Sequence, residues 1–197
     1  MEARLSDFRE AWERVRPGLH PIGYLLRRDQ APYWLRFHSL PESKRYADTE
    51  AERKLILSRQ NALAAEVLGE GTCWLVQSHW VTPAGMTDLA DAEDPFRATC
   101  DYGLRFAFQF AEGEEDAEAS RWNVHAIETR WTTGAFDDVL LSIADYVAGP
   151  TLWMASTSGN VFAPYDGGVD LFLRDTGEVA SLAAAHPQWL SLHAQGL

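Results

Sequence analysis

The sequence predicts a single α+β domain over residues 1–197, with about four helices packed on a mostly antiparallel sheet of about six or seven strands. Three observations predict this fold. First, 197 residues suffice for one domain of ordinary size but are few for two. Second, both helical stripes and period-two strand patterns occur along the chain. Third, no repeat of about 20 to 50 residues recurs, which excludes a solenoid or a propeller.

The N-terminal region predicts one helix followed by extended segments. Apolar residues at spacings of three and four predict a first helix that ends near Pro17-Gly18; they are Leu5, Phe8, Trp12 and Val15. Two short apolar runs come next, IGYLL (22–26) and YWLRF (33–37), and a polar segment with a proline separates them. We therefore expect a hairpin or two successive strands there.

The longest helix is expected over residues 47–68. Asp48 or Thr49 is a suitable N-cap, Glu52 is placed to complete a capping box, and Gly69 ends the helical pattern. The stripe expected to face the core consists of Leu55, Ile56, Arg59, Leu63 and Val67.

Antiparallel strands are expected in the centre of the chain, over residues 72–81, 104–112 and 121–131. In the second of them Phe106, Phe108 and Phe110 recur at every other position. Because successive side chains of a strand point to opposite faces, we expect these three rings on one face of the sheet.

The C-terminal region predicts, in order, a helix, a hairpin, a further strand and a final helical segment that Pro187 interrupts. These elements are expected over 134–148, 151–165, 169–173 and 178–195. The hairpin turns at Ser158-Gly159-Asn160.

Charge is distributed unevenly along the chain. Residues 1–60 carry 12 basic and 9 acidic side chains, whereas residues 61–197 carry 5 and 20, in agreement with the net charge of −12. An acidic, loop-rich insertion is expected over 88–120, with carboxylates at Asp88, Asp91, Glu93, Asp94, Asp101, Glu112, Glu114, Glu115, Asp116 and Glu118. A field of this sign repels nucleic acid and anionic membranes and speeds encounter with a basic protein. The simpler interpretation is a solvated loop that its charges keep soluble.

Several other classes of function lack a signature in the sequence. Cys73 and Cys100 have neither zinc-ligand nor disulfide-framework spacing, and the histidines form no HExxH or HxH pair, so no metal site is predicted. Glycine-rich phosphate loops and the GxSxG nucleophile motif do not occur, so no cofactor and no catalytic residue is predicted. Without a signal-peptide pattern or an apolar run of about 20 residues, the chain is expected to be cytoplasmic.

The stretch WLRFHSLPESKRYADTEAER (34–53) carries the first candidate ligand turn. His38, Lys44, Arg45 and Tyr46 can converge on an anion where a strand leads into a helix, since free backbone amides there favour negative charge. The alternative interpretation is a structural joint, with Lys44 and Arg45 exposed and Tyr46 packed against the next helix.

The segment APYDGGVD (163–170) carries the second candidate turn, with Asp166 and Asp170 around two glycines. The glycines allow the close approach of a ligand or of another backbone. Two carboxylates are too few for a calcium site, so the sequence favours a Gly-Gly turn in which the aspartates bond to local amides.

The regions 34–69 and 160–197 together resemble an uncharacterised bacterial family. The resemblance is carried by the HSLP-x-SKRYA turn, the PYDGG-x-D segment and the terminal WLS-x-H-x-x-GL. Members of this kind resemble immunity proteins of polymorphic toxin systems, which implies a small cytoplasmic protein that neutralises a toxin. The resemblance implies no reaction, cofactor or catalytic residue.

Two specific functions follow as hypotheses, beside a third class, a structural or assembly protein, which an acidic soluble domain also fits. In the first, the protein is an immunity protein that covers the active site of a cognate, basic bacterial toxin; the acidic insertion steers the encounter, and Trp80 and Trp122 anchor the interface. In the second, it is a small enzyme or ligand-binding domain that uses the two candidate turns. The second hypothesis requires both turns to lie on one concave surface.

Overall fold

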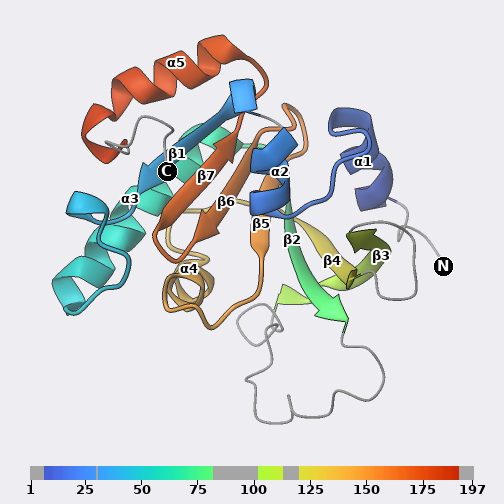
Figure 1. Ribbon diagram of the computed structural model, residues 1–197, viewed down its shortest axis with the longest axis horizontal. Helices are drawn as coiled ribbons and strands as arrows, with labels where there is room; N and C mark the ends of the chain where they lie inside the picture. The colour runs from blue at the N-terminus through green and yellow to red at the C-terminus, as the bar shows by residue number, and fades with distance from the viewer. Residues whose placement is uncertain (1–6, 30, 82–101, 113–119, 191–197) are drawn as a thin grey trace.

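Seven strands form one sheet in the computed structural model, which describes residues 7–29, 31–81, 102–112 and 120–190 (Figure 1). The strands are β1 (Trp34–His38), β2 (Thr72–Val81), β3 (Arg105–Glu112), β4 (Ser120–Arg130), β5 (Thr151–Ala155), β6 (Val161–Tyr165) and β7 (Gly168–Phe172). Their order across the sheet is β1-β7-β6-β5-β2-β4-β3, and each neighbouring pair is antiparallel. The prediction of an α+β fold with an antiparallel sheet is confirmed.

Helices cover both faces of the sheet. The α-helices of the described residues are α1 (Asp7–Val15), α2 (Gly23–Asp29), α3 (Glu50–Leu68), α4 (Asp137–Ala144) and α5 (Thr176–Ala185), and short 3-10 helices span Ala31–Tyr33, Pro41–Ser43 and Pro187–Trp189. Helices α3 and α4 pack on one face, α1 and α2 pack on the other, and α5 lies beside β1 (Figure 1).

Alternation along the central strands divides the apolar core into two layers. Trp153 of β5 packs with Phe162 on the face that α3 and α4 cover. Its neighbours Leu152 and Met154 lie on the opposite face, with Trp12 of α1 and Leu26 of α2. All five residues of β5 are buried, because a strand covered on both faces has no solvent side.

Helix α3 begins and ends near the residues that the sequence predicts. The Thr49 hydroxyl accepts a hydrogen bond from the backbone N–H of Glu52 at 3.2 Å, and the Glu52 carboxylate accepts one from the Thr49 N–H at 3.1 Å, which completes the capping box. Gly69 follows the last turn with a φ of 67°. Leu55 and Arg59 of the predicted stripe are only partly buried. The buried side chains of α3 are Ile56, Gln60, Asn61, Leu63, Ala64, Val67 and Leu68.

The three central strands are confirmed, but the expected placement of the phenylalanines is wrong. A bulge between Phe106 and Phe108 shifts the register of β3, so that Phe106 lies opposite His125 and Phe108 lies opposite Val124. Because Val124 and His125 are consecutive in β4, they point to opposite faces. Phe106 therefore lies on the other face from Phe108 and remains 48% exposed.

Residues 23–26 belong to helix α2 and Ile22 directly precedes it, so the prediction of a strand there is wrong. Ile22, Leu25 and Leu26 are buried at the i, i+3, i+4 spacing of a helix, and Leu26 packs into the core layer under α1. The predicted extended run 33–37 does form β1, but β1 pairs with β7 rather than in a hairpin with residues 22–26. A five-residue apolar run fits either periodicity, and packing on the sheet selects the helix.

The C-terminal elements are confirmed, with a shorter helix α4, and residues 191–195 of the last expected segment lie outside the described part of the chain. Helix α4 ends at Ala144, so Val147 lies beyond it and is 40% exposed. The hairpin of β5 and β6 leads to β7, and α5 is followed by the 3-10 turn at Pro187. Leu190 then forms an antiparallel bridge with Phe37 on β1. No helix in the part of the chain that the structure describes is long and apolar enough to cross a membrane.

Strands β1 and β7 approach each other most tightly at Gly168. A Cβ atom at this position would lie 2.1 Å from the carbonyl oxygen of Phe37 and 3.1 Å from the Cα of His38. Both are backbone atoms of the paired strand, so they can move only if β1 moves. The second glycine of the predicted Gly-Gly turn is therefore required by the pairing of the two strands.

Gly168→Ala is expected to destabilise the protein by about 1–3 kcal/mol, because the new methyl group overlaps the β1 backbone. Thermal unfolding followed by circular dichroism would measure the effect. Gly71→Ala is the matched control, since a Cβ there would lie 3.6 Å from Thr157 Oγ1, an ordinary contact. Equal melting temperatures for the two variants would contradict the packing argument.

Candidate functional site

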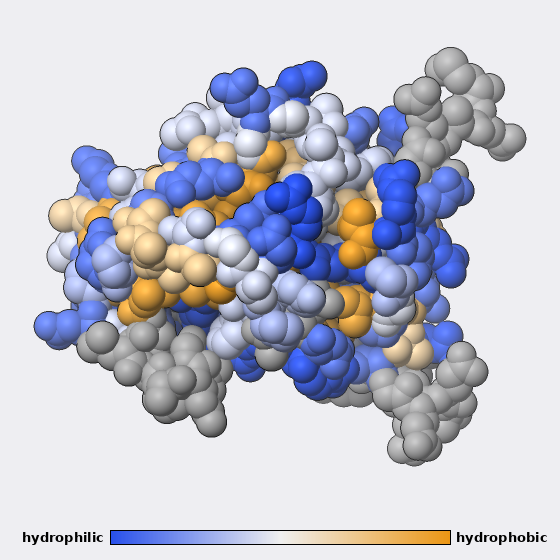
Figure 2. All heavy atoms as spheres, turned by 90° about the horizontal axis from the view of Figure 1, so that it is seen from above, coloured by the Kyte–Doolittle hydropathy of each residue, from blue (hydrophilic) through white to orange (hydrophobic). Residues whose placement is uncertain are grey.

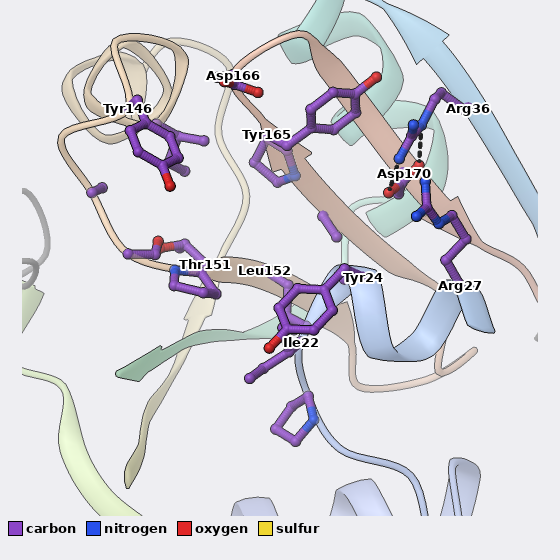
Figure 3. Close-up of a pocket in the computed structure, with 18 of the residues that line it drawn as sticks. Ile22, Tyr24, Arg27, Arg36, Tyr146, Thr151, Leu152, Tyr165, Asp166 and Asp170 are labelled. Atoms are coloured by element: carbon purple, nitrogen blue, oxygen red, sulfur yellow. Dashed lines mark hydrogen bonds and ion pairs between the residues drawn. The ribbon is translucent and has the colours of Figure 1, made fainter. Parts of the chain in front are cut away.

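A cleft of about 660 Å³ opens on the α2 side of the sheet (Figure 3). Its floor is formed by apolar residues of β5 and β6, among them Leu152 and Ala163. Its walls come from α2, the segment between α4 and β5, and the residues around β1 and the β6–β7 turn. The polar and aromatic residues that line it are Tyr24, Arg27, Arg36, Arg45, Trp122, Tyr146, Thr151, Tyr165, Asp166 and Asp170.

The cleft exists because α2 is too short to cover the sheet. A seven-residue helix is about 10 Å long, whereas a five-residue strand spans roughly 17 Å. Part of the face that β5, β6 and β7 present to α2 therefore stays open. Exposed apolar side chains gather at this opening, since Tyr24, Tyr146 and Val147 all line it and are 46%, 79% and 40% exposed. On the face shown in Figure 2, polar side chains surround smaller areas of apolar ones.

Asp170 of β7 is the most heavily bonded carboxylate of the cleft. Its oxygens accept hydrogen bonds from Arg36 Nε at 2.7 Å and from Arg36 Nη2 at 2.8 Å. Oδ1 also accepts from Trp34 Nε1 at 2.8 Å. Trp34 and Arg36 are both in β1, and Arg36 lies directly opposite Asp170 in the pairing of β1 with β7. A bidentate ion pair, with only 6% of the Asp170 side chain exposed, thus joins these strands at the wall of the cleft.

Asp166 brings the two candidate turns together. Its Oδ2 accepts hydrogen bonds from Arg45 Nε at 2.8 Å and from the Tyr46 hydroxyl at 2.9 Å. Arg45 and Tyr46 follow β1, whereas Asp166 lies in the β6–β7 turn. Arg45, Asp166 and Asp170 all line the cleft, so residues from both turns share one concave surface.

His38 and Lys44 of the first turn lie elsewhere. The His38 ring is half-buried between the turns, within 3.3 Å of the Ser43 hydroxyl and hydrogen-bonded to the backbone of Gly167. Burial, followed by the charge of Arg36, lowers its pKa. Lys44 forms ion pairs with Asp48 and Glu52 at the start of α3. His38, Lys44 and Tyr46 are not among the residues that line the cleft, so Arg45 alone represents the first candidate turn there.

Glu112, expected in the acidic partner-binding segment, supports the opposite wall. Its Oε2 accepts hydrogen bonds from the Tyr24 hydroxyl and from Trp122 Nε1, both at 3.1 Å. Burial, and then the neighbouring Glu112, raises the pKa of Tyr24 to about 12, so its hydroxyl stays protonated and can donate. Two aromatic lining residues from α2 and β4 are thereby joined through the end of β3.

The other expected partner-binding residues give less structural information. Trp80 lies opposite Trp122 in the pairing of β2 with β4 and is 38% exposed. Apart from Glu112, the expected acidic residues lie outside the described part of the chain; they are Asp88, Asp91, Glu93, Asp94, Asp101, Glu114, Glu115, Asp116 and Glu118. Their role in steering a basic partner stays a prediction.

No group of three or more histidine, cysteine, aspartate or glutamate side chains in the described residues is arranged to hold a metal ion. Asp166 and Asp170 each face an arginine. Cys73 is buried in β2, and burial raises the pKa of its thiol to about 11. This thiol is therefore protonated near neutral pH and is not an activated nucleophile.

Six of the polar and aromatic lining residues were not singled out from the sequence; they are Tyr24, Arg27, Arg36, Tyr146, Thr151 and Tyr165. Tyr24 and Arg27 lie on α2, where the sequence predicts a strand followed by a polar segment, and Tyr146 follows α4. Tyr146 has a φ of 59°, a left-handed conformation that glycine usually occupies after a helix. The i, i+3, i+4 spacing of Ile22, Leu25 and Leu26 is the signal that could have revealed α2. Nothing in the sequence marks Tyr146.

Comparison with protein families places the chain in one of them. The family described as domain of unknown function DUF3885 matches residues 22–194, which include every residue that lines the cleft except Pro21. The chain belongs to this family. Comparison with curated proteins and with solved structures gives no match. Since the family description states no activity and no partner, the resemblance to immunity proteins stays a prediction.

Asp170→Asn is expected to lower the free energy of unfolding by about 3 kcal/mol, because the largely buried Arg36 loses its charge partner. Asp166→Asn, the comparison variant, should cost less than about 1 kcal/mol, since 63% of the Arg45 side chain is exposed to solvent. Equilibrium unfolding in urea would measure both. A larger loss of unfolding free energy for Asp166→Asn than for Asp170→Asn would contradict this ranking of the two ion pairs.

Glu52→Gln is expected to change how stability depends on pH. A hydrogen bond from Lys44, then one from the backbone of Asp48, lower the pKa of Glu52 to about 2. Because this pKa lies below the unfolded value of about 4.3, the carboxylate stabilises the fold above pH 4.3 and loses that contribution as the pH falls toward 2. Glutamine keeps the capping box but removes the charge. The difference in melting temperature from the wild type should therefore be largest near neutral pH and vanish near pH 2; a constant difference would contradict it.

Proposed function

We propose that this protein is a ligand-binding domain that holds a small organic molecule in the cleft. The observation that carries the proposal is the meeting of the two candidate turns, which are far apart in the sequence, at one concave surface lined by aromatic and apolar residues. Small-molecule sites have this composition, with a mainly apolar lining and a few positioned polar groups, and volumes of about 300–1,000 Å³.

The polar groups of the cleft favour binding over catalysis. Asp166 and Asp170 each accept hydrogen bonds from an arginine and one further donor, so neither is poised as a general base. Burial raises the pKa of Tyr165 to about 12, which keeps that phenol neutral. These side chains position a ligand through fixed donors and rings, and none of them supplies an activated nucleophile.

Val147→Trp is expected to abolish the binding of small organic fragments, because Val147 is an exposed residue of the cleft wall and an indole there fills the opening. Ligand-observed NMR with a fragment panel would measure binding to the wild type and to the variant. Ala180→Trp is the control, since Ala180 is exposed on α5 and does not line the cleft. Failure of every fragment to bind the wild type, or equal binding to Val147→Trp, would refute the proposal.

A second candidate function is neutralisation of a basic toxin in the cytoplasm. It is supported by the net charge of −12 and by the partly exposed Trp80 near the end of β2, the strand that precedes the acidic insertion in the sequence. Tryptophan is enriched among the residues that dominate binding energy at protein interfaces. Co-purification with a basic toxin, together with rescue of growth, is the observation that this candidate requires.

A further inference from the structure

Arg27 differs from the other arginines of the cleft in its partners. Arg36 is paired with Asp170, and Arg45 is paired with Asp166. Within the described part of the chain, Arg27 has no carboxylate partner, and its guanidinium lies over the ring of Trp34 with Cζ 5.8 Å from the centroid. The charged lining residues therefore leave one positive charge in excess, in a protein whose net charge is −12.

Trp34 places the Arg27 guanidinium near Asp170, but Arg27 forms no ion pair with this carboxylate within the described part of the chain. The indole N–H donates to Asp170 Oδ1, and both oxygens of Asp170 already accept from Arg36. Figure 3 shows Arg27 and Arg36 on the same side of the cleft, next to Asp170. The fork of N–H groups on Arg27 thus stays available, and a guanidinium fork binds a carboxylate or phosphate through two parallel hydrogen bonds.

Aromatic rings stand at the other sides of the cleft. Tyr24 is fixed through its hydroxyl, which donates to Glu112 and points away from Arg27 (Figure 3). Tyr146 lies across the cleft from Arg27 and is 79% exposed, so no other part of the described chain covers most of its ring. The fixed ring of Tyr24 and the exposed ring of Tyr146 can both contact a planar group, and stacked or edge-to-face contacts favour such a partner.

We propose that the ligand is a planar organic anion, with its ring between Tyr24 and Tyr146 and its carboxylate or phosphate on Arg27. This inference rests on the proposed function and specifies the chemistry of the ligand. Because the protein as a whole repels anions, binding of an anion here requires the local excess charge at Arg27. The cleft volume of about 660 Å³ accommodates a ring of one or two cycles with its charged substituent.

The test uses matched aromatic probes and neighbouring arginine variants. Phenyl phosphate and benzoate are the anionic probes, benzyl alcohol and benzamide are the neutral ones, and isothermal titration calorimetry measures each Kd. The anions should bind about tenfold tighter than the neutral probes, as expected for a charge-assisted hydrogen-bonded pair. Arg27→Gln should abolish that difference.

Arg28→Gln is the matched control, because Arg28 is the next residue of α2, is exposed and does not line the cleft. It should leave the preference for anions unchanged, and thermal unfolding checks that both variants fold. Equal binding of anionic and neutral probes, or an unchanged preference in Arg27→Gln, overturns the anion inference and leaves the cleft function intact. If no aromatic probe binds, but other fragments bind the wild type and fail to bind Val147→Trp, only the inferred ligand chemistry is wrong.

Discussion

The buried carboxylate of Asp170 is the constraint on which the cleft depends. A charge with so little access to water is tolerated only when donors surround it, and β1 supplies them from Arg36 and Trp34. Because both donors come from one strand, the pairing that satisfies the charge also sets the register of β1 on β7. The same indole ring then carries the Arg27 guanidinium, so a single carboxylate orders groups from β1, β7 and α2.

One side of the cleft is formed by polar residues held in ion pairs, and the other by aromatic residues, two of which are hydrogen-bonded to Glu112. On the polar side, one ion pair joins β1 to β7 and a second joins Arg45 to Asp166 in the β6–β7 turn. On the aromatic side, the single oxygen of Glu112 holds both Tyr24 and Trp122. Tyr146 is the exception, since it is highly exposed and in a left-handed conformation. Most of the site is therefore ordered before a ligand binds, which lowers the entropy lost on binding.

Local patterns allowed most of the fold to be predicted, and long-range packing explains the failures. Helix α3 combines a long run of helix-forming residues with a capping box and a terminal glycine, and β2 combines β-rich composition with clear ends, so both were predicted closely. Residues 22–26 are too few to establish a period, and their contact with the sheet decides the outcome. The bulge at Phe106 leaves the sequence pattern unchanged while it inverts the face of that ring.

The candidate site was predicted in part for the same reason. Arg45, Asp166 and Asp170 lie in turns with distinctive sequence motifs, and these motifs made them candidates. Arg27 and Tyr146 lie in segments without such a motif. Arg27 gains its place from Trp34 on β1, and β1 pairs with β7, a pairing between distant parts of the chain that no local pattern encodes. Lys44, adjacent to Arg45, is drawn instead to the acidic start of α3.

The tight approach at Gly168 also limits what a shared sequence motif can mean. A position at which any Cβ would meet backbone atoms admits one residue type, whatever the protein binds. Selection for the pairing of the two strands would therefore be enough to retain this glycine, even if the ligand changed. Variation at Arg27 or Tyr24 is under no such backbone constraint, so it is at these positions that relatives with different ligands would be free to diverge.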